Sequence, residues 1–280
     1  MRYYGACITL NHTLFGQTLA NSVVFYATNN RYIQAMDQRR FPYGIRMTVT
    51  DAGIESLARS VEFLCRETAC GTFQVEPAFD HGRASQEGLA LTHHQCFATA
   101  FMEAYDIAVS YGRHLYYSGA RPWLITSQFC QAIEKALVVT PDGLLTACYE
   151  VCGKEHALVQ DFFFGALSRH GTINMDPEVR EQLYERIGQR RTLCEDCFCY
   201  WHCAGDCPAK TLTSKLNGHL SFGERCDLNR VITKEVLIRY ITAGGGVWQR
   251  EKPAKSLLME APNDRLEERR SYKADTPGPA

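Results

Sequence analysis

Hydrophobic and polar residues alternate at positions 45–50, and this period of two predicts a β-strand. The period then changes, because apolar residues recur at steps of three or four, or close to it, as on one face of a helix. That face consists of Ile54, Leu57, Ala58, Val61 and Leu64. Thr50 or Asp51 is expected to cap this helix, and residues 72–75 predict the next strand. A strand, a helix and a strand with short connections form a βαβ unit, which requires a parallel sheet.

The same succession of strand and helix patterns continues through the first 120 residues. A helix is predicted at residues 92–111 and a parallel strand at residues 114–117. Upstream, residues 3–10 predict a strand, residues 22–27 are a β-branched and aromatic run, and residues 31–39 predict a helix. Residues 1–120 are therefore expected to form repeated β/α units.

A different pattern begins after residue 122. Residues 136–140 and 144–148 predict the two strands of a β-hairpin, since the Pro-Asp-Gly sequence between them favours a turn. Asp176 and Pro177 predict the start of a helix that extends to about residue 190, with Asp as its cap and Pro in the first helical position.

The last predicted helix covers residues 231–242. It is expected to end at the three glycines at positions 244–246, because glycine frees the chain to turn. From about residue 250 to residue 280 the chain is polar, charged and contains proline, which predicts a disordered tail.

Composition narrows the class of protein. Of the 280 residues 45% are hydrophobic, and the formal net charge of −1 predicts no general attraction to nucleic acid or to an anionic membrane. The sequence contains no apolar run of the roughly 18 residues that a transmembrane helix needs. Its first ten residues do not have the pattern of a secretory signal. We therefore expect a cytoplasmic protein that binds neither nucleic acid nor membrane.

Thirteen cysteines are present, and their spacing is the most informative feature of the sequence. Five of them crowd into fourteen residues: Cys194, Cys197, Cys199, Cys203 and Cys207. Cys130 and Cys148 precede this group, and Cys226 follows it. Thiolates at such short gaps can converge on one metal centre. A disulfide framework is disfavoured, since the number of cysteines is odd and the chain is neither small nor visibly secreted.

The spacing is compatible with two kinds of metal centre. A C-x2-C pair followed by C-x3-C fits a four-cysteine zinc site, although Cys199 intrudes and the thiols outnumber the needs of one site. Each [4Fe–4S] cluster also takes four thiolates and tolerates varied spacings. The residues alone leave zinc and iron–sulfur open.

The cysteine string resembles the SPASM domain, the C-terminal extension of many radical S-adenosylmethionine (SAM) enzymes that holds auxiliary iron–sulfur clusters. Residues 139–143 before Cys148, and residues 203–208, resemble the sequences around the cysteines of that family. A looser likeness to the late strands of a radical SAM barrel lies at residues 46–50, 75–77 and 82–84.

The resemblance implies an α/β fold in three parts. Residues 1–120 would be the late strands of a partial parallel β/α barrel. Residues 121–242 would be a Cys-rich SPASM-like domain with a β-hairpin and short helices. Residues 243–280 would be a polar tail.

Two [4Fe–4S] clusters follow from the resemblance. The ligands of an outer, fully ligated cluster are matched by Cys194, Cys197, Cys203 and Cys226. Three ligands of an inner cluster are matched by Cys130, Cys148 and Cys207. Family members with a fourth inner ligand have one more cysteine shortly before the first, where this chain has none at residues 123–126. The inner cluster is therefore expected either to keep one open iron or to use Cys152 or Cys199.

Radical SAM enzymes bind their catalytic cluster through a C-x3-C-x2-C motif, and the 280 residues contain no such motif. The sequence is therefore expected to lack the first barrel strands and not to cleave SAM alone. SAM would be a cofactor only if the missing half is supplied.

By resemblance, the function is that of a peptide- or protein-modifying maturase, of the anaerobic sulfatase-maturase-like or the peptide-crosslinking type. The expected partners are a peptide or protein substrate and an electron donor such as a ferredoxin or flavodoxin. The competing class is a non-catalytic adaptor, stabilised by zinc or by a cluster, that holds a peptide.

Other polar residues carry weaker signals. His202, inside the cysteine group, could donate an N–H to a cluster sulfur, whereas His93 and His94 are expected to be exposed or to cap a helix. Glu76 and Arg83 are expected near the C-terminal ends of barrel strands, where ligands gather, with packing or a salt bridge as the alternative.

Overall fold

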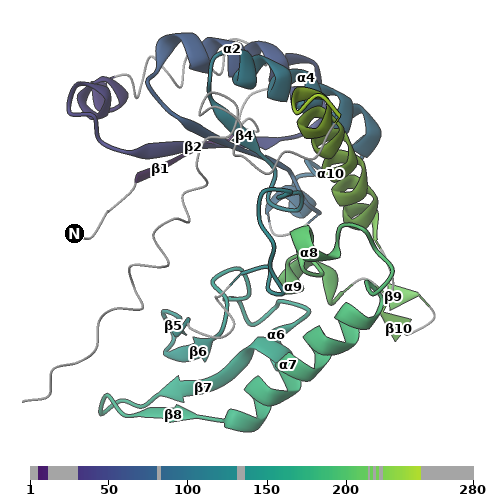
Figure 1. Ribbon diagram of the computed structural model, residues 1–280. Coiled ribbons are helices and arrows are strands. Elements are labelled where there is room, and N and C mark those ends of the chain that lie inside the picture. The colour runs from purple at the N-terminus through teal and green to yellow at the C-terminus, as the bar shows by residue number, and fades with distance from the viewer. Residues whose placement is uncertain are drawn as a thin grey trace, which may run out of the picture.

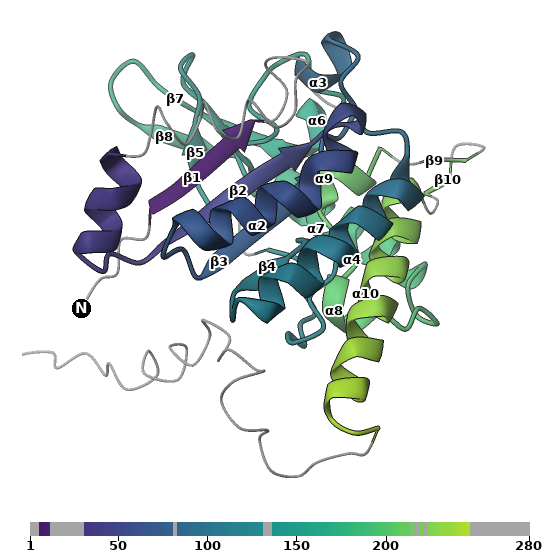
Figure 2. The same ribbon diagram turned by 90° about the horizontal axis from the view of Figure 1, so that it is seen from above.

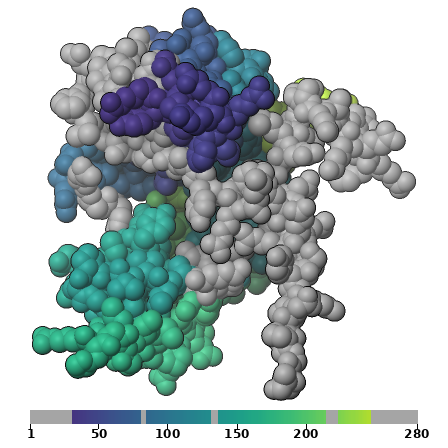
Figure 3. Space-filling view, turned by 90° about the vertical axis from the view of Figure 1, so that its left-hand side faces the viewer, coloured from purple at the N-terminus to yellow at the C-terminus, as the bar shows by residue number. Residues whose placement is uncertain are grey.

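The computed structural model describes residues 6–11, 31–80, 83–130, 136–213, 215–216, 219–220 and 223–246. The aromatic run at residues 22–27 and the predicted tail from residue 250 lie outside these residues. The described chain forms two units, one above the other in Figure 1, with a long helix along one side of the upper unit. Figure 3 shows the upper unit in purple and blue and the lower unit in teal and green.

A four-stranded parallel sheet forms the upper unit. Its strands, in spatial order, are β1 (Ala6–Asn11), β2 (Tyr43–Val49), β3 (Thr72–Pro77) and β4 (His114–Tyr116). Ile45 pairs with Ile8 on one side and with Phe73 on the other, and Phe73 pairs with Leu115. The prediction of repeated parallel β/α units is thus confirmed for these strands. Within the described residues the sheet is open and does not close into a barrel.

Helices cover one face of this sheet: η1 (Asp51–Ser56), α2 (Leu57–Glu67) and α4 (His94–Ser110). Figure 2 shows α2 and α4 side by side. Residues 31–38 form a helix before β2, and the single turn α3 (Arg83–Gln86) follows β3. The strands alternate as expected for a sheet with one covered face: Met47 and Val75 are fully buried, whereas Arg46 and Gln74 on the other face are half-buried.

The predicted cap of the helix after β2 is confirmed in its position only. Thr50 occupies the N-cap position, but its side chain makes no capping hydrogen bond. The Asp51 carboxylate instead accepts from the Thr92 hydroxyl at 2.6 Å and from the backbone N–H groups of Thr92 and His93 at 3.0 Å. Asp51 therefore ties the start of η1 to the start of α4, because the N–H groups that precede a helix need an acceptor.

A four-stranded antiparallel sheet lies in the lower unit. Its strands, in spatial order, are β5 (Val138–Val139), β6 (Leu144–Thr146), β7 (Phe163–Leu167) and β8 (Ile173–Met175), and α6 (Val159–Phe162) precedes β7. The predicted hairpin is confirmed: β5 and β6 pair across a turn in which Gly143 has a φ of +80°. A hydrophobic core separate from that of the upper unit includes Leu145, Val151, Leu158, Phe162, Phe164, Leu183 and Leu212.

The remaining elements surround the cysteines. They are α7 (Pro177–Thr192), α8 (Tyr200–Cys203), α9 (Pro208–Thr211), the short ladder of β9 (Lys215–Leu216) with β10 (His219–Leu220), and α10 (Glu224–Ala243). α7 begins as predicted, since the Asp176 carboxylate accepts from the Glu178 N–H at 3.0 Å.

α10 begins at Glu224 and not at residue 231 as predicted. Its apolar side chains Leu228, Ile232 and Val236 are buried in the core of the upper unit, although the helix follows the cysteine group in sequence. α10 therefore connects the two units. None of the helices within the described ranges has the length and hydrophobicity to cross a lipid bilayer.

Candidate metal centre

The cysteine group is a tight sequence of turns between α7 and α9. Cys194 follows α7, Cys199 occupies the N-cap of α8, and Cys203 ends that helix. The next three residues, at positions 204–206, all have positive φ values of 50°, 78° and 65°. Left-handed backbone is rare outside glycine, so this turn must be held by other contacts before Cys207 begins the next helix.

Asp206 provides those contacts. It is 2% exposed, and its carboxylate accepts from Arg225 Nε at 2.5 Å, from Arg225 Nη2 at 2.6 Å and from Asn229 Nδ2 at 2.9 Å. It also accepts from the Cys207 N–H at 2.6 Å. Burial opposes ionisation of Asp206, but the Arg225 guanidinium outweighs it and lowers the pKa of the carboxyl. A charged pair thus fixes the left-handed turn between Cys203 and Cys207.

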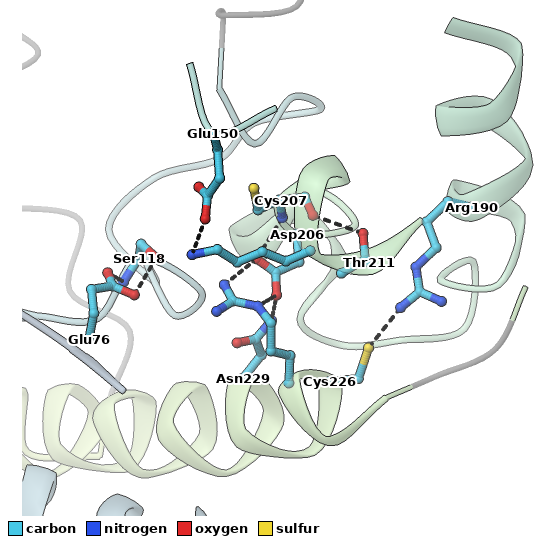
Figure 4. Close-up of polar contacts among 11 residues, drawn as sticks. Glu76, Ser118, Glu150, Arg190, Asp206, Cys207, Thr211, Cys226 and Asn229 are labelled. Atoms are coloured by element: carbon cyan, nitrogen blue, oxygen red, sulfur yellow. Dashed lines mark hydrogen bonds and ion pairs between the residues drawn. The ribbon is translucent and has the colours of Figure 1, made fainter. Parts of the chain in front are cut away.

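The same arginine connects the turn to the parallel sheet. The Arg225 guanidinium lies 4.1 Å from the centre of the Phe79 ring and 5.6 Å from that of Tyr117. Nearby, the buried Glu76 accepts from the Ser118 N–H and from the Ser118 hydroxyl, each at 3.0 Å. Figure 4 shows Glu76 and Ser118 on one side of this network and Asp206 and Asn229 in its middle. Glu76 therefore holds the Ser118 backbone and hydroxyl in place, and the Arg83 side chain lies outside the described residues.

The four predicted outer ligands, Cys194, Cys197, Cys203 and Cys226, affect one another electrostatically. Burial raises the pKa of Cys194, and the neighbouring Cys226 and Cys197 add to this effect. Burial, Asp206 and then Cys194 and Cys197 raise the pKa of Cys203 to about 12. Cys194 is thus close enough to Cys197, Cys203 and Cys226 for electrostatic interaction, although 32 positions separate Cys194 from Cys226 (226 − 194).

Two arginines contact this outer set of thiols. Arg190 Nη2 lies 3.0 Å from Cys226 Sγ, and Cys194 Sγ lies 3.8 Å from the Arg190 carbonyl oxygen. The Arg230 guanidinium hydrogen-bonds Cys197, which raises the pKa of the arginine. Cationic N–H donors beside cysteine sulfur stabilise its thiolate form, the form that binds metal.

The three predicted inner ligands are related to one another less directly. Burial raises the pKa of Cys148, and the exposed Cys130 contributes to this shift. The pKa of Tyr149 is raised by its own burial, with smaller contributions from Cys148 and Cys207. Cys207, in turn, has its pKa raised to about 12 by burial and by Asp206. Cys148 therefore interacts with Cys130, and both Cys148 and Cys207 act on Tyr149, whereas Cys130 also acts on Arg121 together with Cys203 of the outer set.

The two candidates for a fourth inner ligand lie in different places. Cys199 is 1% exposed, and its Sγ lies 3.9 Å from the Asn229 carbonyl oxygen of α10. Its pKa is raised to about 12 by burial, and its thiol neighbours are Cys197 and Cys203 of the outer set. Cys152 is exposed and lies in the loop of Cys148. Of the two, Cys152 is the one on the inner side.

Among the described residues, no three His, Cys, Asp or Glu side chains converge closely enough to hold one metal ion. A single zinc ion gathers its sulfur ligands within about 2.3 Å of one point. A four-iron cluster takes its thiolates on separate irons, so its ligands need not meet at one point.

The histidines near the site have other partners. The His202 ring nitrogen Nδ1 lies 3.1 Å from the Leu124 carbonyl oxygen, so that nitrogen is committed to the backbone. His93 pairs with Asp51 at 3.1 Å, and His94 pairs with Glu224 at 2.8 Å.

A cavity of about 770 Å³ separates the end of β3 from the cysteine unit. Sequence reasoning did not indicate it, because its walls come from segments that are distant in the chain. Its lining includes Phe79, Glu150, Arg190, Lys210 and Cys226. Lys210 Nζ lies 4.2 Å from the centre of the Phe79 ring and 3.2 Å from a Glu150 carboxylate oxygen. The lining of the cavity therefore combines an aromatic ring, charged groups of both signs and the thiol of Cys226.

A scan against protein-family models found no match to this chain, and a search of the curated proteins found none either. The proposal for the function of this chain is therefore based on the cysteine spacing and on the contacts described above.

Proposed function

We propose that this chain is a radical SAM/SPASM family protein that binds two auxiliary [4Fe–4S] clusters. The observation that carries the proposal is the spacing of the seven cysteines, which matches the family pattern. Electrostatic contacts support it: Cys197 and Cys226 act on Cys194, Cys194 and Cys197 act on Cys203, and Cys130 acts on Cys148.

The residues fit such clusters in number and chemistry. The outer cluster would be held by Cys194, Cys197, Cys203 and Cys226. The inner cluster would be held by Cys130, Cys148 and Cys207, and either Cys152 or a substrate atom would complete it. When bound, the clusters supply one-electron transfer and, at an open iron, a position for a substrate ligand.

The rest of the chain would hold the substrate. The parallel sheet would form the late strands of a partial barrel, and ligands of such sheets bind at the carboxyl ends of the strands. The cavity beside Phe79 lies after β3 at that end and has room for several residues of a peptide. A peptide or protein substrate would bind there, and a ferredoxin or flavodoxin would deliver electrons. SAM cleavage would need a C-x3-C-x2-C motif, which this sequence does not contain.

Anaerobic reconstitution with iron and sulfide tests the proposal. Two clusters predict about eight irons and eight sulfides per chain and a brown colour that dithionite bleaches. Cys226→Ser and Cys148→Ser should each lower the iron content by about half, because each removes a ligand of one cluster. Cys96→Ser is the matched control, since Cys96 is an exposed thiol on α4 outside both sets.

Two results would contradict the proposal. A folded, colourless protein with stoichiometric zinc would favour the peptide-binding adaptor instead. A folded protein that takes up neither iron nor zinc would exclude both functions. Within the iron–sulfur case, unchanged iron and spectra in Cys152→Ser would exclude Cys152 as a ligand.

A further inference from the structure

Arg190 is the most unusual charged residue near the cysteines. It lies in the last turn of α7 and is only 2% exposed. Burying a guanidinium is costly unless an anion or a set of acceptors compensates for the lost water. Its Nη2 donates to a sulfur, that of Cys226 at 3.0 Å, as Figure 4 shows.

Both ends of Arg190 face the outer set. Its guanidinium donates to Cys226 Sγ, and its carbonyl oxygen accepts from Cys194 Sγ at 3.8 Å. One residue of α7 thus contacts two of the four thiols.

A neutral thiol is a weak hydrogen-bond acceptor, whereas a thiolate is a strong one. The contact between Arg190 and Cys226 therefore gains most of its strength when the sulfur carries negative charge. Sulfur that ligates an iron–sulfur cluster carries such charge, and the charge increases when the cluster is reduced.

We propose that Arg190 is a positioning residue that donates an N–H to the Cys226 thiolate of the outer cluster and raises the reduction potential of that cluster. This inference rests on the proposed function. A one-electron reduction, with the electron from dithionite or a reduced flavodoxin, adds one negative charge beside the guanidinium and transfers no proton. The fixed positive charge and the N–H···S bond stabilise the reduced state more than the oxidised state, which makes reduction easier.

The test is a redox titration of the reconstituted full chain, followed by electron paramagnetic resonance, with iron and sulfide counted in the same samples. In Arg190→Gln, one of two midpoints should move to a more negative value while the iron content stays that of wild type. At a fixed ambient potential the reduced-to-oxidised ratio of that cluster should fall about tenfold, which is 59 mV for one electron. Arg190→Lys, which keeps the charge, should restore part of the loss.

The matched control is Arg169→Gln, because Arg169 is an exposed arginine at the β7–β8 turn of the same unit. It removes the same charge and should leave both midpoints unchanged. If Arg190→Gln does not fold, Arg190→Met provides a second neutral variant of similar length that keeps the packing.

The outcomes separate the two proposals. Wild-type protein that binds no iron would overturn both the proposed function and this inference. Wild-type protein with two clusters, whose midpoints are the same in a folded, fully loaded Arg190→Gln or Arg190→Met variant, would overturn this inference alone. A shift of the same size in Arg169→Gln would overturn it too, since the effect would then be one of net charge.

Discussion

Gly119 shows how a single residue can be fixed by its surroundings. A Cβ atom at this position would lie 2.0 Å from Asn229 Oδ1 and 2.8 Å from Tyr117 Cε1. Asn229 cannot move away freely, because its amide donates to the buried Asp206 carboxylate. Only glycine leaves room for the contact between the chain after β4 and helix α10.

Gly119→Ala should therefore destabilise the protein by about 1–3 kcal/mol, since overpacking displaces the buried network. Gly188→Ala is the control: Gly188 is exposed in α7 and no atom lies within 4 Å of its added Cβ. That change should stabilise by about 0.5–1 kcal/mol through helix propensity. Chemical denaturation measures both. Equal effects of the two substitutions would show that Asn229 gives way.

At the scale of elements, an aspartate joins two helices that the sequence treats separately. Asp51 precedes α2 and accepts from the backbone and side chain before α4. Burial opposes its ionisation, but the hydrogen bonds from Thr92 and His93 outweigh this and lower its pKa from 3.8 to about 2. Its stabilising effect is therefore complete above pH 3.8 and lost as the pH falls toward 2.

Asp51→Asn should lower the free energy of unfolding at pH 7 by about 1–2 kcal/mol, since charged hydrogen bonds are lost. The difference between the variant and wild type should narrow as the pH falls through 3.8, where wild type also loses the charge. Asp106→Asn is the control, because the Asp106 side chain is 55% exposed and pairs with Arg239 at the surface. Loss of this pair should cost less than about 1 kcal/mol. Urea denaturation between pH 7 and pH 3 measures all three. A difference that stays constant with pH would show that the Asp51 charge is not what stabilises the contact.

The elements were predictable to different degrees. The strands of the parallel sheet, helices α2, α4 and α7, and the β5–β6 hairpin follow from local periodicity and turn residues. β7 and β8 were not predicted, because residues 163–167 lack alternation and β8 has three residues. The first turns of α10 were missed because Arg225 and Asn229 are polar but buried against Asp206, a partner 19 to 23 positions away.

At the scale of the whole molecule, the buried thiols make the free energy of unfolding depend on pH and on metal binding. Burial and Asp206 raise the pKa of Cys203 and of Cys207 from 9.0 to about 12. In the metal-free protein these thiols stay protonated at pH values where an unfolded chain loses their protons. Their contribution to stability is therefore complete below pH 9 and lost as the pH rises toward 12.

Between pH 8 and pH 10, Cys203 and Cys207 should each cost metal-free protein about 1.4 kcal/mol of stability, in addition to other buried thiols such as Cys199. Protein loaded with iron and sulfide should lose much less, since its ligand sulfurs are already deprotonated. Cys207→Ser, in metal-free form, should lose about 1.4 kcal/mol less than wild type, because one titrating thiol is gone. Guanidinium denaturation at the two pH values measures each form. An identical pH dependence in the loaded and metal-free proteins would exclude these thiols as metal ligands.

The sequence by itself determined the β/α order of the first unit, the hairpin and the identity of the sulfur-bearing residues, because periodicity, turn preference and spacing act between near neighbours. Only the tertiary structure decided which thiols are neighbours, that Cys199 lies with the outer set, and that Asp206 pairs with Arg225. It also decided that Arg190 is buried against Cys226. These contacts join segments 19 to 36 residues apart, and their strength comes from burial, which no local pattern encodes.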